Sequence, residues 1–462
     1  MGIIRSAGTI RAPQIAGRFY PNDPSSCRAL VQTSLQQGLP AYGIKTKVLV
    51  APHAGHVYSG QIAGTAYQPL QERSMQISRV VLLAPAHRIS FRGLAITNVE
   101  AWASPLGTIP IDWPALQSVL NLPDVAINDD AFEGEHSLEV QLPFIQTVFP
   151  NASLVPLLVG DADQWLVSRA LELLWGGPET LIVISTDLSH FLASDQARKM
   201  DHQTSIWIEL LRPDKLDGNN ACGVRALAGA LDQASRRDMR VTALDVRHSG
   251  DITGQQERVV GYGAFAMEQA HGVRLPEELR QQLINAAREA IKWRLKHGKI
   301  ATINFKEPLP APLRSFRASF ITLKLKGVLR GCVGTVAAKR PLIIDVIENA
   351  CKAAFEDPRF QPLSIDELDC LSVSVSILST PRQIKLKDEP DLLRQIKPDL
   401  DGLILQDQDR GGLFLPSVWA SLPEAEVFLR QLKGKAGLPP DHWSSSLQIH
   451  RFSTEIFESA FS

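Results

Sequence analysis

Histidines, a carboxylate and a thiol stand at the ends of apolar runs in this sequence, where they could bind a metal or move protons. The stretch KVLVAPHAGH contains His53 and His56, and RVVLLAPAHR repeats the Ala-Pro ending before His87. A third run, LIVISTDLSH, ends in Asp187 and His190. In doubly wound sheets the carboxyl ends of successive strands converge on one ligand site. Imidazole and carboxylate groups gathered there predict a metal centre or an acid–base site.

Two further segments carry groups of the same kind. AFEGEHSLEVQLPF contains Glu135, His136 and Glu139, and a helix over this stretch would place His136 and Glu139 on one face. NNACGVRALAGALDQA places Cys222 just before a predicted helix, which one of the preceding asparagines could cap. A thiolate at that position is stabilised by the helix dipole, and thiolates are good ligands for iron, copper and zinc.

Each of these residues also has an ordinary structural explanation. A histidine after a strand is often a hydrogen-bonded polar group, Cys222 could be a small buried hydrophobe, and the glutamates could form a solvated helix face. Because all of them fall at strand ends or helix starts, a shared pocket is favoured. We therefore expect His53 and His87 within one metal's coordination sphere, and His56 outside it.

The elements that must position these residues alternate between strands and helices. This pattern is typical of an α/β domain with a mostly parallel sheet and flanking helices. Several predicted strands are apolar throughout, as expected for strands that are covered on both faces. The predicted strands are 47–51, 79–84, 93–97, 153–159, 181–185 and 259–267, and the predicted helices are 25–36, 165–174, 195–211 and 223–235.

The pattern changes near residue 268. We place a linker at 269–275, between a first domain at 12–268 and a second domain at 276–462. In the second domain FITLKLKGVLRGC predicts a hairpin with a Lys-Gly turn, residues 341–355 predict a helix, and CLSVSVSIL predicts a strand. LILQDQDRGGLFLP predicts another hairpin, which turns around Arg410-Gly411-Gly412. The second domain is therefore predicted to be α+β.

The second domain holds one further candidate site, in the stretch LRGCVGT. Arg330 would favour a thiolate at Cys332 or bind an anion, and the flanking glycines permit close backbone approach. The alternative is a glycine-bent hairpin whose cysteine belongs to the core, beside an ion-paired helix end at AFEDPRF. For Cys332 the core explanation is preferred, and an anion or peptide groove near Arg330 stays open.

Composition sets further limits on the function. The 462 residues carry a formal net charge of -1, which gives no electrostatic pull toward nucleic acid or an anionic membrane. No apolar run approaches the roughly 20 residues that span a bilayer, and no secretory signal pattern is expected. The five cysteines form no CxxC pair, which favours reduced thiols in a cytoplasmic protein.

Five motifs in order, APHAGHVYSG, LLAPAH, EGEHSLEVQLPF, STDLSH and NNACG, resemble the Memo family over residues 12–268. The resemblance implies a fold similar to class III extradiol dioxygenases and a mononuclear metal pocket. It maps the metal ligands onto His53, His87 and Cys222, and an acid–imidazole pair onto Asp187 and His190. The full set of candidate catalytic residues is Asp187, His190, His136 and Glu135.

The sequence departs from the families that it resembles at a few positions. Thr186 replaces the commoner serine, and Gln141 stands where some relatives carry a histidine. An extradiol dioxygenase uses two histidines and a carboxylate, so a thiolate in the third position would change the potential of the metal. We expect iron(II) or copper, with zinc as a further candidate, and we do not carry catechol cleavage over from the fold.

Four motifs in the second domain resemble the AMMECR-type domain: RASFITLKLKGVLRGCVGT, ENACKAAFEDPRFQPLS, VSVSILSTPRQI and DGLILQDQDRGGLFLPSVW. Domains of this type occur with a Memo-like protein and a radical S-adenosylmethionine protein, which the resemblance makes a candidate partner. The leading hypothesis is a metal-dependent redox or oxygenase-like protein that acts on a small molecule or peptide. The alternatives are a non-catalytic metal- or peptide-binding scaffold and a metal-free Cys-His nucleophilic enzyme.

Overall fold

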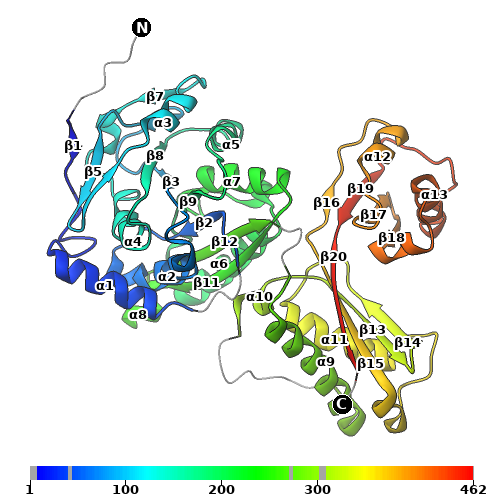
Figure 1. Ribbon diagram of the computed structural model, residues 1–462. Coiled ribbons are helices and arrows are strands. Elements are labelled where there is room, and N and C mark those ends of the chain that lie inside the picture. The colour runs from blue at the N-terminus through cyan, green and yellow to red at the C-terminus, as the bar shows by residue number, and fades with distance from the viewer. Residues whose placement is uncertain (1–7, 40–43, 270–273, 301–308, 461–462) are drawn as a thin grey trace. The chain divides into compact units, whose positions relative to one another are not determined.

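The computed structural model describes residues 8–39, 44–269, 274–300 and 309–460. The chain divides into two compact units, Met1–Ala270 with Pro310–Pro312 and His271–Leu309 with Leu313–Ser462. Figure 1 shows the first unit in blue to green and the second in green to red. Each unit has a hydrophobic core of its own, so each can be described separately.

The first unit is built on a nine-stranded sheet whose order is β10-β12-β2-β9-β3-β8-β4-β7, with β11 paired to β12 off this path. The strands are β2 (Val48–Ala51), β3 (Arg79–Pro85), β4 (Leu94–Ile96), β7 (Val125–Ile127), β8 (Ser153–Val159), β9 (Thr180–Ser185), β10 (His190–Leu192), β11 (Met239–His248) and β12 (Val259–Gln269). The centre, β2-β9-β3-β8, is parallel, while β12 and β4 join it in antiparallel fashion. The predicted mostly parallel α/β fold is confirmed.

Helices flank this sheet, and a small second sheet contains β1 (Ile10–Arg11), β5 (Ala101–Ser104) and β6 (Gly107–Pro110) (Figure 1). The helices are α1 (Pro24–Gln36), α2 (His56–Tyr67), α3 (Trp113–Val119), α4 (Leu142–Val148), α5 (Gln164–Leu173), α6 (Ser194–Glu209), α7 (Val224–Arg236) and α8 (Ser249–Thr253). The long predicted helices appear within one or two residues of their expected bounds. Helix α2 and the antiparallel strand β11 were not predicted from the sequence.

The condition under which His136 and Glu139 would share a helical face is not met. The stretch from Glu135 to Glu139 is not a helix: Glu135 and His136 lie in a loop, and a 3-10 helix, η3, begins only at Glu139 (Glu139–Gln141). His136 and Glu139 therefore share no helical face. The loop conformation is fixed by the carboxylate of Glu135, which accepts hydrogen bonds from the backbone N–H groups of His136 and Ser137 and so competes with helical pairing.

The central parallel strands bring three loops to one edge of the sheet. β9 lies between β2 and β3, with Ala51 opposite Ser185 and Leu83 opposite Ile184. All three strands are buried along their lengths. Because parallel strands end at the same edge, the loops that follow them leave the sheet side by side.

The second unit has two four-stranded antiparallel sheets and is α+β, as predicted. The first sheet contains β13 (Ser319–Leu325), β14 (Val328–Gly334), β15 (Leu371–Leu378) and β20 (Thr454–Ala460), and the second contains β16 (Arg382–Gln383), β17 (Gly402–Asp407), β18 (Arg410–Phe414) and β19 (Gln448–Phe452). The helices are α9 (Glu277–His297), α11 (Leu342–Phe355), α12 (Glu389–Gln395) and α13 (Ala425–Lys435), while the short α10 (Ala311–Arg314) has residues in both units.

The two predicted hairpins of the second unit turn differently from one another. The first turns at Lys326 and Gly327, both with positive φ (51° and 84°), as the Lys-Gly pair predicts. The second turns at Gln408-Asp409, because Asp407 pairs with Arg410. The predicted turn at Arg410-Gly411-Gly412 is therefore wrong, and these residues begin β18.

Candidate metal centre

His53 follows β2 and is held from behind by a buried hydrogen-bond chain. Its Nδ1 lies 3.1 Å from the hydroxyl of Ser185, at the end of the neighbouring β9. That hydroxyl donates to the carbonyl of Ser137 and accepts from the amide of Gln141. Since the only hydroxyl proton is already donated, Nδ1 of His53 must be the donor to Ser185. The other ring nitrogen, Nε2, is left facing away from this chain.

His87 and His136 are both held by one carboxylate. Glu135 Oε1 lies 3.1 Å from Nδ1 of His87 and 3.2 Å from Nδ1 of His136. The other oxygen, Oε2, accepts a hydrogen bond of 2.6 Å from the backbone N–H of His87. Because an ionised carboxylate only accepts, both imidazoles donate through Nδ1. Glu135 is 2% exposed, so it positions the two rings from within the protein.

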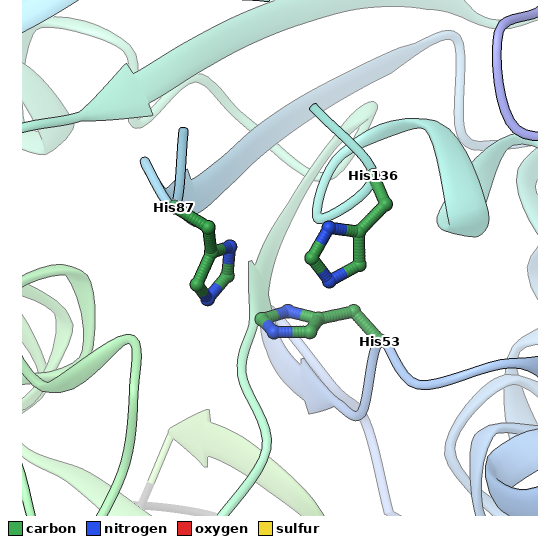
Figure 2. Close-up of side chains that lie close together, drawn as sticks. All are labelled: His53, His87 and His136. Carbon is green, nitrogen blue, oxygen red and sulfur yellow. The ribbon is translucent and has the colours of Figure 1, made fainter. Parts of the chain in front are cut away.

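The three imidazoles converge on one point, as Figure 2 shows. One ring nitrogen from each of His53, His87 and His136 lies within 4.8 Å of the others. The centroid of the His53 ring lies 5.2 Å from that of the His87 ring and 5.4 Å from that of the His136 ring. We call these three residues the histidine cluster. Imidazoles whose far nitrogen is tied to an acceptor and whose near nitrogens meet are typical of metal sites, so the residues present fit a metal ion.

Cys222 lies beside the cluster, in the loop before α7, and the structure groups His136, in place of the expected Cys222, with His53 and His87. Its Sγ lies 3.2 Å from Nε2 of His53 and accepts the backbone N–H of Asp187 at 3.3 Å. The predicted asparagine cap is not present: the N-cap residue is Gly223, whose N–H donates instead to the hydroxyl of Thr186. The departure from the commoner serine at Thr186 therefore keeps the hydroxyl that this contact needs.

Asp187 and His190 lie next to the cluster and not within its shared centre. Asp187 Oδ1 accepts the backbone N–H of His53 at 2.8 Å and so fixes the loop that carries this ligand candidate. His190 is half-buried at the start of β10. Burial lowers the pKa of His190, against the opposing charge of Asp187.

The electrostatics of the cluster centre on Glu135. Burial alone would raise the pKa of this carboxyl group, but hydrogen bonds from His136 and His87 hold it well below its usual range. Burial would also lower the pKa of His87, but hydrogen bonds with Cys222 and Glu135 outweigh it and raise the pKa to about 9. A raised pKa favours the protonated form of His87 at neutral pH.

A cavity of about 500 Å³ opens beside the cluster, and His87 and Cys222 both line it. His87 has a side chain that is 30% exposed, whereas His53 is 1% exposed. The cluster can thus be reached from the cavity through His87 and Cys222. The volume is in the range of pockets that hold small organic ligands.

Two of the residues that the sequence singled out lie outside the centre. His56 starts α2 and is buried, with Nε2 donating to the carbonyl of Val140 at 2.9 Å. Glu139 is fully buried in an ion pair with Arg11 at 2.7 Å and also accepts the hydroxyl of Tyr20. Both are structural in this position, and the expectation that His56 would stay outside the cluster agrees with its placement.

Sequence reasoning missed the supporting residues Ser185 and Gln141. Gln141 attracted notice only as a departure from relatives, yet its amide donates to the carbonyl of Pro52 and to Ser185. These contacts buttress the loop and the ring of His53. A serine that ends a wholly apolar strand was the available signal, because a buried hydroxyl needs partners.

The second candidate site, which we call the LRGC patch (Arg330 and Cys332), is bonded to other residues of the second unit. Arg330 forms a two-pronged ion pair with Glu367 at 2.6 and 3.0 Å. The backbone N–H of Cys332 donates to Asp357, while its Sγ lies 3.3 Å from the hydroxyl of Thr322. Arg330 therefore pairs with a carboxylate, where the sequence had suggested a thiolate or an external anion.

The glycine between these two residues has a packing function. A Cβ at Gly331 would lie 2.1 Å from the carbonyl oxygen of Ala353, in the last turn of α11. Only glycine allows β14 to run this close to the helix. This explains the glycine of LRGC without a ligand. Cys332 itself is only partly buried, so the expectation that it belongs to the core is not met.

Two family models match this chain. The family model described as Memo-like protein matches residues 11–266, and the model described as AMMECR1 matches residues 284–457. A MEMO1 family protein of Aquifex aeolicus is 31% identical over 265 residues, which cover 55% of this chain and 97% of the relative. A MEMO1 family protein of Archaeoglobus fulgidus is 30% identical and is covered over 98% of its length.

Other relatives match a smaller share of this chain. A protein of Thermococcus gammatolerans is 38% identical over 197 residues, which cover 41% of this chain and 94% of the relative. A crystal structure of an uncharacterised protein from Pyrococcus horikoshii is 36% identical, covers 40% of this chain and 94% of its own, and has a TM-score of 0.37. Among the described residues, no helix is long and apolar enough to cross a membrane.

Proposed function

Since this chain belongs to the Memo-like family and carries an AMMECR1 domain behind its Memo-like domain, we propose that its first unit is a metal-dependent redox or oxygenase-like domain. The histidine cluster would hold one metal ion, with Cys222 as an additional ligand. The observation that carries the proposal is the orientation of the three imidazoles, each tied through Nδ1 to an acceptor behind it. Such support is what metal-binding histidines require.

The position of Cys222 supports its inclusion among the ligands. Two donors bound to one tetrahedral ion, a nitrogen at roughly 2.0 Å and a sulfur at roughly 2.3 Å, lie about 3.5 Å apart. The 3.2 Å between Cys222 Sγ and His53 Nε2 is close to this value. The ligand set mapped by resemblance, His53, His87 and Cys222, would thus be extended by His136.

A bound iron or copper ion would supply redox chemistry, whereas zinc would supply only Lewis acidity. Around it, Asp187 would hold the His53 loop through its hydrogen bond to the backbone N–H. Half-buried His190, with its lowered pKa, would be a neutral proton acceptor at pH 7. Glu135 would position His87 and His136 and would not itself accept a substrate proton, because its oxygens already accept their N–H groups.

The donor set guides the choice of metal. Three imidazoles and a thiolate suit iron(II), copper or zinc, and we propose iron(II) or copper because the family resemblance implies redox chemistry. The set differs from the two histidines and carboxylate of extradiol enzymes, so catechol cleavage is not part of the proposal. The substrate would be a small molecule or peptide, and a radical S-adenosylmethionine protein would be the partner of the fused chain.

Metal analysis of the full chain, purified without an affinity tag, tests the proposal. We expect close to one iron or copper ion per chain, reduced below a tenth in His53→Ala and lowered in Cys222→Ser and His136→Ala. His56→Gln is the matched control, because it removes a neighbouring buried imidazole outside the cluster, and it should keep full metal content. If His53→Ala and Cys222→Ser both bind as much metal as the wild type, the ligand assignment is wrong.

A metal-free Cys-His nucleophile is the second candidate, favoured by the short contact between Cys222 and His53. This alternative predicts that chelator-treated protein releases a burst of about one p-nitrophenolate per chain from p-nitrophenyl acetate, which Cys222→Ser abolishes. Absence of the burst excludes it. A third alternative, a non-catalytic binding protein, would be favoured if the metal-loaded chain neither consumes oxygen nor changes any metabolite in extracts that contain the radical protein.

A further inference from the structure

The cavity beside the histidine cluster combines apolar walls with two arginines. His87 and Cys222 line it, and each is followed by an arginine that also lines it: Arg88 directly after His87, and Arg225 three residues after Cys222. Apolar side chains complete the wall, namely Pro85, Ile89, Phe91, Val159 and Val224. The loops that carry the reactive groups into the cavity therefore also carry positive charge.

The two arginines differ in how far their charge is already neutralised. Arg225 pairs with Asp161 at 2.7 Å and donates to the carbonyl of Gly160. Among the described residues Arg88 belongs to no ion pair, and it packs over Gly134, where a Cβ would come within 3.2 Å of its Nε. Asp161 is the one acidic residue among those that line the cavity, so the two arginines leave a net positive charge.

The start of α7 adds to this positive field. Gly223, Val224, Arg225 and Ala226 all line the cavity, so the N-terminal end of a 13-residue helix faces it. No acidic residue stands in the first turn to neutralise that end. The helix dipole places partial positive charge there, and its effect is added to that of Arg88.

We propose that this cavity binds a small organic anion, with its carboxylate or phosphate group against Arg88 and its apolar body against Phe91 and Val224. The reacting part of the molecule would then lie next to His87 and Cys222. This placement rests on the proposed function, whereas the selectivity for an anion follows from the lining itself and needs no metal. A neutral molecule of the same shape would leave Arg88 without a counter-charge.

The experiment measures ligand binding to the metal-free full chain by calorimetry, with benzoate, phenyl phosphate and neutral benzamide as probes. At least one of the two anions should bind about tenfold more tightly than benzamide, and comparison of the two distinguishes a carboxylate site from a phosphate site. Arg88→Ala should remove the preference for the anion, and Arg88→Lys should keep part of it. Arg236→Ala, which removes an exposed arginine at the far end of α7, should change nothing.

A second readout places the anion in this cavity. A bound anion should slow the reaction of Cys222 with iodoacetamide and leave the reaction of Cys332 unchanged, as followed by peptide mass spectrometry. The proposal is overturned if benzamide binds as tightly as both anions, if no probe binds, or if Arg88→Ala behaves like Arg236→Ala. If the anion binds in this way while the purified chain holds no metal, the proposed function fails and this inference stands.

Discussion

The histidine cluster and the LRGC patch were both candidate sites in the sequence, but they differ in which of their polar groups are left free. In the cluster each ring is tied through Nδ1 to a serine or glutamate behind it, and the opposite nitrogens face a common point. In the patch Arg330 pairs with Glu367, and Cys332 donates its backbone N–H to Asp357. One arrangement presents ligand atoms, and the other directs its polar groups to partners within its own unit, although Nη1 of Arg330 is buried without a hydrogen-bond partner.

This difference teaches how to separate a binding site from a structural network. A binding site holds its groups by one side and leaves the other side open. A structural network pairs donors with acceptors until few remain, and its glycines serve close packing, as Gly331 does against Ala353. The following predictions test this distinction, beginning with the largest expected effect.

Removing a ring from the cluster should have the largest effect. We expect His87→Ala and His136→Ala to lower the affinity for the metal at least 100-fold, more than loss of a supporting group does. Cys332→Ser, in the patch, should change it by less than twofold. Competition against a chromogenic chelator measures all three affinities. Equal losses in Cys332→Ser and His87→Ala would contradict the assignment of the site to the first unit.

Removing the support behind the rings should have the next largest effect. In Glu135→Gln the remaining amide oxygen can still accept from both rings, but an NH₂ group then faces the backbone N–H of His87, which loses its acceptor, and the negative charge behind the rings is lost. The affinity for the metal should fall about 10- to 100-fold. Glu367→Gln is the matched control, since it removes the acceptor of Arg330, and it should leave metal affinity unchanged. A Glu135→Gln chain that binds metal like the wild type would show that the support is dispensable.

His56 provides a test within the first unit, because it is a buried histidine outside the cluster. Burial lowers the pKa of His56 to about 4. Below about pH 6.5 the His56 ring is protonated in the unfolded chain but stays neutral in the folded chain. The free energy of unfolding therefore falls as the pH falls from about 6.5 toward 4. Between pH 7 and pH 5 the contribution of His56 to the free energy of unfolding should fall by about 2 kcal/mol.

Urea unfolding of the metal-free chain at pH 7 and pH 5 measures this loss of stability. His56→Gln retains a donor for the carbonyl of Val140 but has no titratable ring, so its own loss over this range should be smaller by about 2 kcal/mol. An unchanged pH dependence in the variant would mean that His56 can accept a proton in the folded state.

Thiol protection should give the smallest effect. Metal loading should slow alkylation of Cys222 about tenfold, because a coordinated thiolate is no longer free to react. Cys332, whose Sγ contacts the hydroxyl of Thr322 in the second unit, should react at the same rate with and without metal. Peptide mass spectrometry after a timed iodoacetamide pulse reports both rates. Equal protection of the two thiols would point to a general change of conformation.

The sequence predicted the parts of the fold that depend on long apolar runs. β2, β3, β8 and β9 were recognisable because strands buried on both faces are apolar throughout. Their parallel ends also explain why His53 and His87 could be assigned to one place. β11 was not predicted because its burial pattern is irregular and it carries charged residues: Arg240 pairs with Glu268 of β12, and Asp245 pairs with Arg247 within the strand itself.

The finer features of the site depended on long-range contacts that spacing cannot reveal. A helix would have placed His136 beside Glu139, but the carboxylate of Glu135 holds this stretch in a loop, and the ring of His136 lies next to that of His53. Ser185 and Gln141 act through partners more than 40 residues away. The second hairpin was misplaced because glycines in a strand resemble a turn in the sequence.

The carboxylate of Glu135 also governs the charge balance of the buried centre. In the metal-free chain this anion is offset by the proton on His87, whose pKa is raised to about 9. A divalent ion at the proposed site would take that proton's place and, with a thiolate at Cys222, would bring the centre back to neutrality. We therefore expect metal uptake to be an exchange of cations, in which protons leave as the ion enters.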